Sequence, residues 1–108
     1  MTYSVKLTET AKQDILEISL YIAELTKDRA TAKRYANGLR DKCNGLRSFP
    51  NAGALPRDEF LRSVGFRYVI YKDKYLIFYK VDDAEKTVTV YAVFNAKADY
   101  TRIMRDLI

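Results

Sequence analysis

The stretch Gly65–Asp83, GFRYVIYKDKYLIFYKVDD, decides the fold. It contains two runs of aromatic and branched aliphatic residues, 65–71 and 75–81, separated by the charged link KDK at 72–74. Such residues favour β-strands, and a link this short joins antiparallel neighbours. The second run is almost entirely apolar, as is typical of a central strand covered on both faces. We therefore expect a β-hairpin whose second strand lies inside a larger sheet.

Two further strands are expected on either side of this hairpin. A third run of the same residue types, 87–94, follows the short polar link at 82–86 and extends the hairpin to a meander. The pair Asp82-Asp83 in that link is interpreted as part of a turn and not as an acid-base pair. Near the N-terminus, residues 3–7 alternate between apolar and polar side chains, which predicts a fourth strand.

Two amphipathic helices are predicted between the first and second strands. Apolar residues recur at spacings of three and four in both, which places them on one buried stripe per helix. The stripes are Ala11, Ile15, Ile18, Ile22 and Leu25 in the first helix, and Ala32, Tyr35, Ala36, Leu39, Cys43 and Leu46 in the second. Thr8 or Thr10 can cap the first helix and Asp28 the second, which ends at the Phe49-Pro50 step. The short connection at 26–28 predicts an antiparallel helical hairpin.

Residues 50–63 contain both prolines and a glycine, and we expect an irregular surface connection there. The tail at 98–108 can form a short helix, with Tyr100, Ile103 and Leu107 on one side. The expected fold class is therefore α+β. An N-terminal strand and an antiparallel two-helix hairpin pack on a twisted, mainly antiparallel four-stranded sheet, followed by a short C-terminal helix or tail, in a single domain over residues 1–108.

Composition narrows the function. The chain has no histidine, which removes the commonest general acid-base, the Ser-His and Cys-His nucleophile pairs and most zinc sites, so we expect no metal and no cofactor. The single cysteine, Cys43, cannot form an internal disulfide, and no apolar leader or long apolar run is present, so a cytoplasmic protein without membrane contact is expected. The net charge of +5 favours a polyanion or an acidic protein as partner.

The order of elements and several segments resemble the RelE/ParE family of toxins from bacterial type II toxin-antitoxin systems. The resemblance covers essentially the whole chain. It is carried by AKQDILEISLYIAE at 11–24, LRSFPNAG at 46–53, GFR at 65–67, YLIFYKVDD at 75–83 and VYAVFNAKADY at 90–100. It implies a toxin that is neutralised by a cognate antitoxin, an acidic protein whose C-terminal segment folds on binding. Exposed apolar grooves beside the helices are its expected landing site.

The family divides by mechanism. RelE-like members cleave messenger RNA on the ribosome, whereas ParE-like members inhibit DNA gyrase without a recognised hydrolytic centre. RNA cleavage needs fixed cations that stabilise the extra charge on the phosphorane. Three positions where RelE-like toxins are expected to carry such cations hold Val69, Leu76 and Ala98 here. The resemblance therefore implies a ParE-like gyrase inhibitor, and catalysis is not expected.

Two alternatives stay open. A RelE-like, ribosome-dependent messenger RNA interferase would use Arg67, Lys97 and Tyr100, and a third possibility is a fold that survives only as a binding module. ParE-like members often carry a histidine and an arginine in the segment corresponding to 93–99, so Asn95 and Ala98 depart from that pattern as well. The target, gyrase or ribosome, is therefore not fixed by the resemblance.

Six residues are candidates for target binding, on a basic open sheet face and at the C-terminal end of the molecule. They are Arg57, Arg62, Arg67, Lys97, Tyr100 and Arg102. Cations beside an aromatic ring suit base stacking or contact with a protein surface. The alternative is structural: the arginines are then solvated surface charges, and Tyr100 packs the tail onto the sheet. The tyrosines within strands are interpreted as packing residues.

Overall fold

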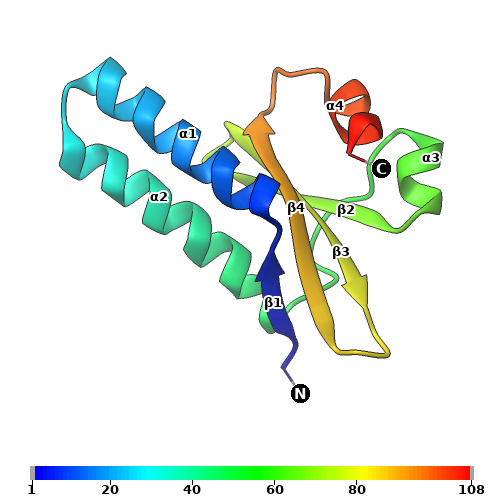
Figure 1. Cartoon of the computed structure of the whole chain (residues 1–108). Coiled ribbons are helices and arrows are strands. Elements are labelled where there is room, and N and C mark those ends of the chain that lie inside the picture. The colour runs from blue at the N-terminus through cyan, green and yellow to red at the C-terminus, as the bar shows by residue number, and fades with distance from the viewer. Residues whose placement is uncertain (1, 108) are drawn as a thin grey trace.

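The computed structural model describes residues 2–107. The sheet has four strands. Figure 1 shows a long helical hairpin at one side of this sheet and short helices at the other. The elements in chain order are β1 (Ser4–Leu7), α1 (Glu9–Thr26), α2 (Arg29–Asn44), the 3-10 turn η1 (Gly45–Arg47), α3 (Glu59–Ser63), β2 (Phe66–Tyr71), β3 (Tyr75–Asp82), β4 (Thr87–Asn95) and α4 (Tyr100–Asp106). The predicted α+β class and the four strands are confirmed.

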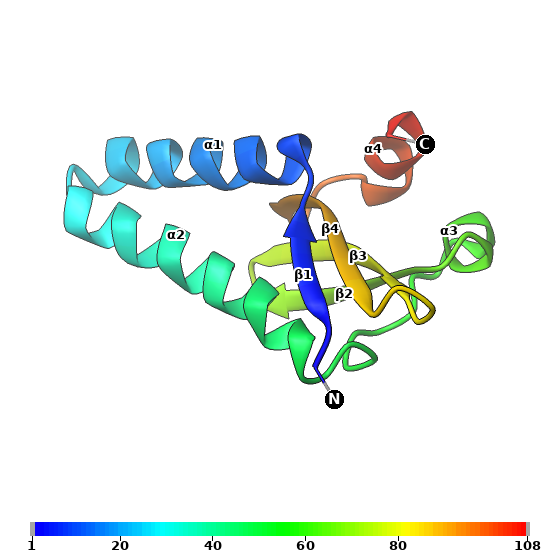
Figure 2. The same ribbon diagram turned by 60° about the horizontal axis from the view of Figure 1, so that its bottom comes forward.

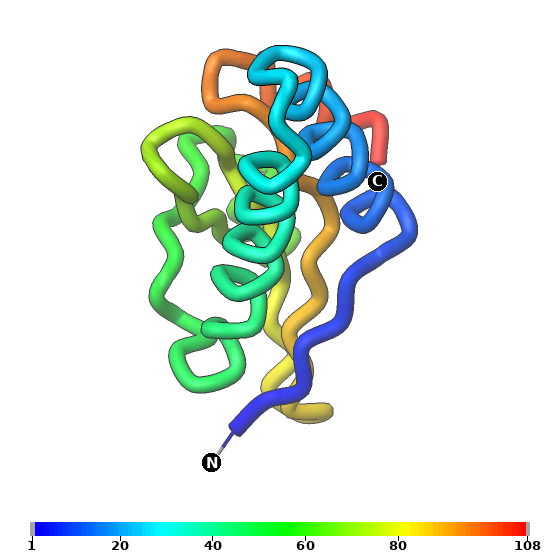
Figure 3. Tube along the Cα trace, turned by 90° about the vertical axis from the view of Figure 1, so that its left-hand side faces the viewer, coloured from blue at the N-terminus to red at the C-terminus, as the bar shows by residue number. Residues whose placement is uncertain are grey.

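The strands are ordered β1-β4-β3-β2. The meander β2-β3-β4 is antiparallel, and β1 pairs with β4 in parallel at the edge of the sheet (Figure 3). The central strand β3 is buried over residues 75–79, on both of its faces, as its apolar sequence predicted. The Asp82-Asp83 pair lies where β3 ends in a turn, and the in-strand tyrosines Tyr75 and Tyr79 are buried.

The two predicted caps position the helical hairpin. The Thr8 hydroxyl accepts the Ala11 N–H at 3.1 Å, and an Asp28 carboxylate oxygen accepts the Ala30 N–H at 3.0 Å. The second helix ends earlier than expected, at Asn44, because η1 carries the chain toward Pro50. No helix in residues 2–107 is long and apolar enough to cross a membrane.

The hairpin packs its apolar stripes on one face of the sheet. Residues that form this first cluster include Ala11, Ile15, Ala36, Leu39, Cys43, Leu46, Ile77, Tyr79, Val88, Val90 and Val93. The expectation for Leu25 was wrong, because its side chain is 66% exposed. The tip of the hairpin projects past the sheet, so the last turn of α1 has no strand beneath it (Figure 2).

A β-bulge gives β4 two different alternations. Phe78 pairs with Ala92 and Tyr79 pairs with Val90, so Tyr91 is an extra residue between two paired ones. As a consequence, Val90 and Val93 both pack in the first cluster, although one has an even number and the other an odd number. Tyr91 and Ala92 together face the opposite side of the sheet, which is how a bulge re-aims side chains.

The opposite face carries a second cluster under α3 and α4. It contains Leu61, Phe66, Leu76, Phe78, Ala92 and Met104. The expectation of an irregular surface loop at 50–63 was wrong in part, because this segment contains α3 and buries Gly53, Pro56 and Leu61. Asp58 starts α3 by accepting the Leu61 N–H at 3.0 Å. The polar cap and the buried leucine give the short helix its fixed place.

The packed side of the C-terminal helix matches the prediction only in part. Met104 is fully buried, whereas Ile103 and Leu107 are 36% and 39% exposed. Tyr100 and Met104 lie one turn apart, and both contact the second cluster. The apolar spacing of Tyr100, Ile103 and Leu107 therefore describes only part of the packed face.

Two side chains from the start of α1 cover the edge of β4 beyond the end of β1. The Thr8 hydroxyl donates to the Tyr91 carbonyl at 3.1 Å, and Asp14 accepts the Val93 N–H at 2.9 Å. Unpaired strand edges invite association with other chains. These two contacts take the place of a neighbouring strand, and partial burial raises the pKa of the Asp14 carboxyl above its ordinary value of 3.8.

Replacing Asp14 with asparagine is expected to leave the free energy of unfolding at pH 7 unchanged, or to raise it by up to about 1 kcal/mol. The amide keeps an acceptor for the Val93 N–H and removes a partly buried charge. Because the folded-state pKa is raised, the contribution of Asp14 to stability improves as pH falls through that pKa. Asp14→Ala loses the acceptor and is expected to cost about 1–3 kcal/mol. Urea titrations at pH 4 and pH 7 measure the free energy of unfolding of each variant. Equal losses of stability in Asp14→Asn and Asp14→Ala would contradict this role.

Cys43 is expected to be unreactive in the folded protein. Its side chain is fully buried under α2, and burial raises the pKa of the thiol to about 12. The thiolate, which is the reactive form, is therefore scarce at pH 8. We expect an aromatic disulfide reagent to label Cys43 at least about 100-fold faster in urea than in buffer, since labelling requires opening of the fold. Rapid labelling of the native protein would contradict the packing.

Candidate functional site

The loop before α3 and the helix α4 meet on the far side of the sheet from the hairpin (Figure 1). The Tyr100 hydroxyl accepts the Arg57 N–H at 3.3 Å, and the Tyr100 ring lies 5.4 Å from the Phe78 ring. Tyr100 thereby links the loop to the core of the second cluster. We call this region the C-terminal surface and define it by Arg57, Arg62, Lys97, Tyr100, Arg102 and Arg105.

Two of its arginines are held by the protein itself. Arg62 Nη1 donates to the carbonyl oxygens of Pro56 and Arg57, both at 3.1 Å. Arg105 Nη2 donates to Asp58 Oδ2 at 3.1 Å, and its guanidinium lies 5.5 Å from the Phe60 ring centroid. Arg105 was missed by the sequence reasoning. Its position three residues after Arg102, on the same short helix, could have identified it from the sequence.

Asp58 is the electrostatic centre of this contact. Its carboxylate caps α3 through the Leu61 N–H, and this bond, followed by the contact with Arg105, lowers the pKa of Asp58 below its ordinary value. One carboxylate therefore fixes α3 and ties α4 to it. The C-terminal surface is a built contact between two short helices and not a frayed tail.

The remaining cations of this surface are exposed. Among residues 2–107, the side chains of Arg57, Lys97 and Arg102 have no hydrogen-bond partner. The expectation of a basic open sheet face was wrong, however. The helices α3 and α4 cover part of the second face, and the segments 57–62 and 97–107 carry five basic and four acidic residues, so the C-terminal surface is close to neutral.

Arg67 lies apart from this surface. It pairs with Tyr79 across β2 and β3, and therefore faces the hairpin side of the sheet. Its Nη1 donates to the Gly53 carbonyl at 3.0 Å in a partly buried position. Tyr100 packs on Phe78 on the opposite face. The fold thus does not bring Arg67, Lys97 and Tyr100 together at one site.

The positions that lack a nuclease cation also lie on different faces. Leu76 is 6% exposed and belongs to the second cluster, whereas Val69 packs against the first. Ala98 lies in the turn before α4, where its N–H donates to the Asn95 carbonyl at 2.9 Å. These three positions therefore do not share one face of the sheet.

Aromatic rings occupy the centre of the second face. Phe78 lies 5.4 Å from the ring centroids of Tyr68, Phe94 and Tyr100, in stacked or tilted pairs. Stacked rings exclude water and present no fixed positive charge. Lys80 adds a cation to this face, with its Nζ 4.7 Å from the Phe66 ring centroid and 5.5 Å from the Tyr91 ring centroid.

The net positive charge is concentrated on one helix of the fold. The helix α2 carries five basic residues, Arg29, Lys33, Arg34, Arg40 and Lys42, and a single acidic one, Asp41. The helix α1 carries four acidic residues, Glu9, Asp14, Glu17 and Glu24, and a single basic one, Lys12. The two helices of the hairpin therefore have opposite charges, and α2 is the strongest cationic element of the fold.

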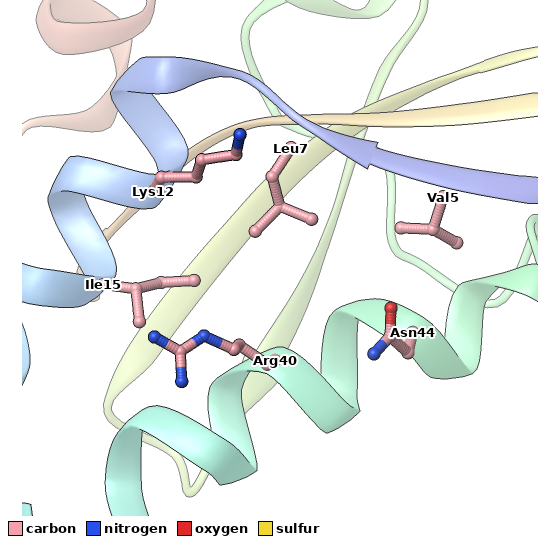
Figure 4. A pocket seen from close by; sticks show the side chains of 6 residues that line it. All are labelled: Val5, Leu7, Lys12, Ile15, Arg40 and Asn44. Atoms are coloured by element: carbon pink, nitrogen blue, oxygen red, sulfur yellow. The ribbon is translucent and has the colours of Figure 1, made fainter. Parts of the chain in front are cut away.

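A cavity of about 480 Å³ opens between β1 and the two helices of the hairpin. Val5, Leu7 and Ile15 give it apolar walls, and Lys12, Arg40 and Asn44 add polar groups (Figure 4). The strand β1 is an edge strand, which leaves one row of its backbone groups without a neighbouring strand. An apolar cavity with cationic groups beside an open strand edge suits an acidic, partly apolar peptide segment.

Comparisons with known proteins agree with this architecture. The chromosomal ParDE toxin-antitoxin system of Pseudomonas aeruginosa contains a chain with 18% identity and a TM-score of 0.72, and the match covers 89% of this chain and 98% of that chain. The RelBE2 toxin-antitoxin complex of Mycobacterium tuberculosis gives 24% identity and a TM-score of 0.56, covering 88% and 99%. A mutant of the E. coli toxin RelE in the free state gives 17% identity and 0.62, covering 100% of both chains. At these identities, the likeness shows the fold alone.

No curated protein matches the sequence. The family profile described as the ParE toxin of the type II toxin-antitoxin system parDE, in contrast, matches residues 5–100. This span begins at the second residue of β1 and ends at the first residue of α4, so it includes the helical hairpin and all of the sheet except Ser4. The chain therefore belongs to the ParE toxin family of type II toxin-antitoxin systems.

Proposed function

We propose that this toxin inhibits DNA gyrase by binding to it and does not cut RNA. The observation that carries the proposal is the separation of the groups that a nuclease would need. Arg67 is bound to the Gly53 carbonyl on the hairpin side of the sheet, and Tyr100 packs on Phe78 on the other side. A phosphorane needs its cations and proton-transfer groups within hydrogen-bond reach of one another.

The C-terminal surface has the composition of a protein-binding site. Besides the cations Arg57, Lys97 and Arg102, this part of the molecule has partly exposed apolar side chains, of which Phe60 is 43% and Ile103 36% exposed. Interfaces between proteins combine arginine and aromatic anchors with a polar rim. A near-neutral mixture of this kind favours a protein target over a nucleic acid. Binding to a phosphate backbone needs a dense cluster of positive charges.

The antitoxin is expected to bind elsewhere, at the cavity between β1, α1 and α2. An acidic segment would place apolar side chains against Val5, Leu7 and Ile15 and carboxylates near Arg40 and Lys12. The positive charge of α2 adds attraction at long range, which raises the association rate. The comparison structures from P. aeruginosa and M. tuberculosis are named as toxin-antitoxin systems or complexes, which supports a protein partner of this kind.

A supercoiling assay with purified gyrase tests the activity. The toxin is expected to block supercoiling, and Arg57→Glu combined with Arg102→Glu is expected to raise the concentration needed for half-inhibition at least about tenfold, since each reversal removes a contact and adds repulsion. The double variant Lys33→Glu and Arg34→Glu on α2 is the matched control, because it makes the same charge change on another surface. It is expected to inhibit like the wild type.

Primer extension on translated messages after induction separates the two mechanisms. Cuts in phase with codons, together with intact gyrase supercoiling, would overturn the proposal in favour of a ribosome-dependent interferase. Induction without any slowing of growth, in cells that lack the antitoxin, would instead show a binding module that is no longer toxic.

A further inference from the structure

The outer face of α1 carries apolar side chains that no other residue of the segment 2–107 covers. Leu16 and Leu20 are 48% and 60% exposed, and they lie one helical turn apart. Figure 2 shows α1 along the top of the molecule, with α2 and the sheet beneath it. The stripe that packs on the sheet, which includes Ala11, Ile15 and Ile22, occupies the other side of the helix. The exposed leucines therefore face away from the core.

The charges around these leucines form a self-complementary pattern. Leu16 and Leu20 each lie two positions from residue 18, Lys12 and Glu24 each lie six positions from it, and Glu9 and Lys27 each lie nine. At every one of these distances an apolar residue matches an apolar residue, or a basic residue matches an acidic one. All four charged side chains are well exposed, from 59% for Lys12 to 91% for Glu9.

We propose that two copies of this chain associate through this face of α1. The helices run antiparallel about a two-fold axis at the level of residue 18. Leu16 then meets Leu20 of the second copy, Lys12 meets Glu24 of the second copy, and Glu9 meets Lys27 of the second copy. An interface of this kind is isologous, since one surface serves both partners.

The existing ion pairs strengthen this arrangement. Within one chain, Lys12 Nζ lies 3.2 Å from Glu9 Oε1, and Lys27 Nζ lies 2.7 Å from Glu24 Oε1. In the antiparallel dimer each pair faces the other pair of the second copy, so four charges alternate in sign at each end of the contact. Single exposed ion pairs contribute little, but networks of several charges contribute more and fix the alignment.

The same charges exclude a parallel arrangement. Two parallel helices would place Lys12 opposite Lys12 and Glu24 opposite Glu24, and like charges in contact are repulsive. A second copy also explains the pattern better than an acidic antitoxin does, because α1 is itself the acidic helix of the hairpin. The cationic α2 remains available to that partner, as does the C-terminal surface across the sheet. Lys12 also lines the cavity, so the dimer and the antitoxin would share this side chain.

The size of the contact sets the expected affinity. The helix has 18 residues and is about 27 Å long, and two leucines per copy form its apolar centre. This is less than the area of a standard stable interface, so the dimer belongs to the weak, reversible class with a dissociation constant in the micromolar range.

Sedimentation velocity of the full chain over micromolar concentrations tests the inference by charge reversal. Lys12→Glu places two glutamates opposite each other at both ends and is expected to raise the dimer dissociation constant at least about tenfold. Glu24→Lys is expected to do the same. The double variant Lys12→Glu with Glu24→Lys restores opposite charges, and its dissociation constant is expected to return to within about threefold of the wild type.

Two further variants complete the test. Leu20→Glu is expected to abolish the dimer while leaving the circular dichroism spectrum unchanged, since the side chain is mostly exposed. Lys42→Glu on α2 makes the same charge change as Lys12→Glu and is expected to have no effect. A wild-type protein that stays monomeric, or a double charge variant that dimerises no better than the single ones, would overturn the inference. Neither result depends on gyrase, so the test is independent of the proposed function.

Discussion

Replacing Phe78 with alanine is expected to lower the free energy of unfolding by about 3–5 kcal/mol. The side chain is fully buried in β3, and its ring lies 5.4 to 6.4 Å from the ring centroids of Phe66, Tyr68, Phe94 and Tyr100. Its removal would leave a cavity at the centre of the second cluster. Since small domains are stable by only about 5–15 kcal/mol, the variant is expected to be marginally folded.

Urea denaturation followed by circular dichroism measures this loss. Phe49→Ala is the matched control, because it removes the same atoms from a side chain that is 70% exposed, and it is expected to change the stability by less than about 1 kcal/mol. Because Tyr100 rests on Phe78, the variant is also expected to release α4 and weaken the C-terminal surface. A loss below about 1 kcal/mol in Phe78→Ala would mean that the ring stack does not support the fold.

Replacing Gly53 with alanine is expected to cost about 2–4 kcal/mol. An added Cβ would lie 2.5 Å from the Tyr79 hydroxyl oxygen and 2.7 Å from the Tyr68 carbonyl oxygen. The second contact is with backbone, which cannot rotate away. The Gly53 N–H donates to the Tyr79 hydroxyl at 2.9 Å, and its carbonyl accepts Arg67 at 3.0 Å, so any displacement also weakens two buried or partly buried hydrogen bonds.

Gly45→Ala serves as the control for the change from glycine to alanine. An added Cβ at that position meets nothing within 4 Å, and the backbone already has the helical conformation, so the stability is expected to stay the same or rise by about 0.5–1 kcal/mol. Urea denaturation compares the two variants, and limited proteolysis reports whether the segment 50–58 loosens in Gly53→Ala. Similar stabilities of both variants would contradict a tightly held loop.

These contacts change the interpretation of Arg67. The guanidinium supports the loop through the Gly53 carbonyl, on the side of the sheet that packs on the hairpin. A cation in this position contributes to the shape of the loop that leads to α3. Of the six candidate residues, Arg57, Lys97 and Arg102 have side chains without a hydrogen-bond partner within residues 2–107, and they belong to the C-terminal surface on the opposite side of the sheet.

The amino-acid sequence by itself determined the elements and their caps. Thr8 and Asp28 start the two helices, and the all-apolar run at 75–79 is the covered centre of the sheet. The apolar stripe from Ala32 to Leu46 is buried except for Tyr35, which is partly buried. These features depend on residues within one or two turns of each other, where spacing and local hydrogen bonds decide the conformation. The family resemblance was equally accessible, since it depends on the order of such elements.

Tertiary structure alone decided which side chains share a surface. The bulge at Tyr91 reverses the alternation of side chains along β4. The helices α3 and α4 cover part of the face that the sequence indicated as open, and Leu25 is exposed because the hairpin extends past the sheet. Arg67 and Tyr100 lie on opposite faces for the same reason: strand register and the packing of distant segments fix where a side chain points. No local spacing encodes either, because both depend on contacts between residues that are far apart in the chain.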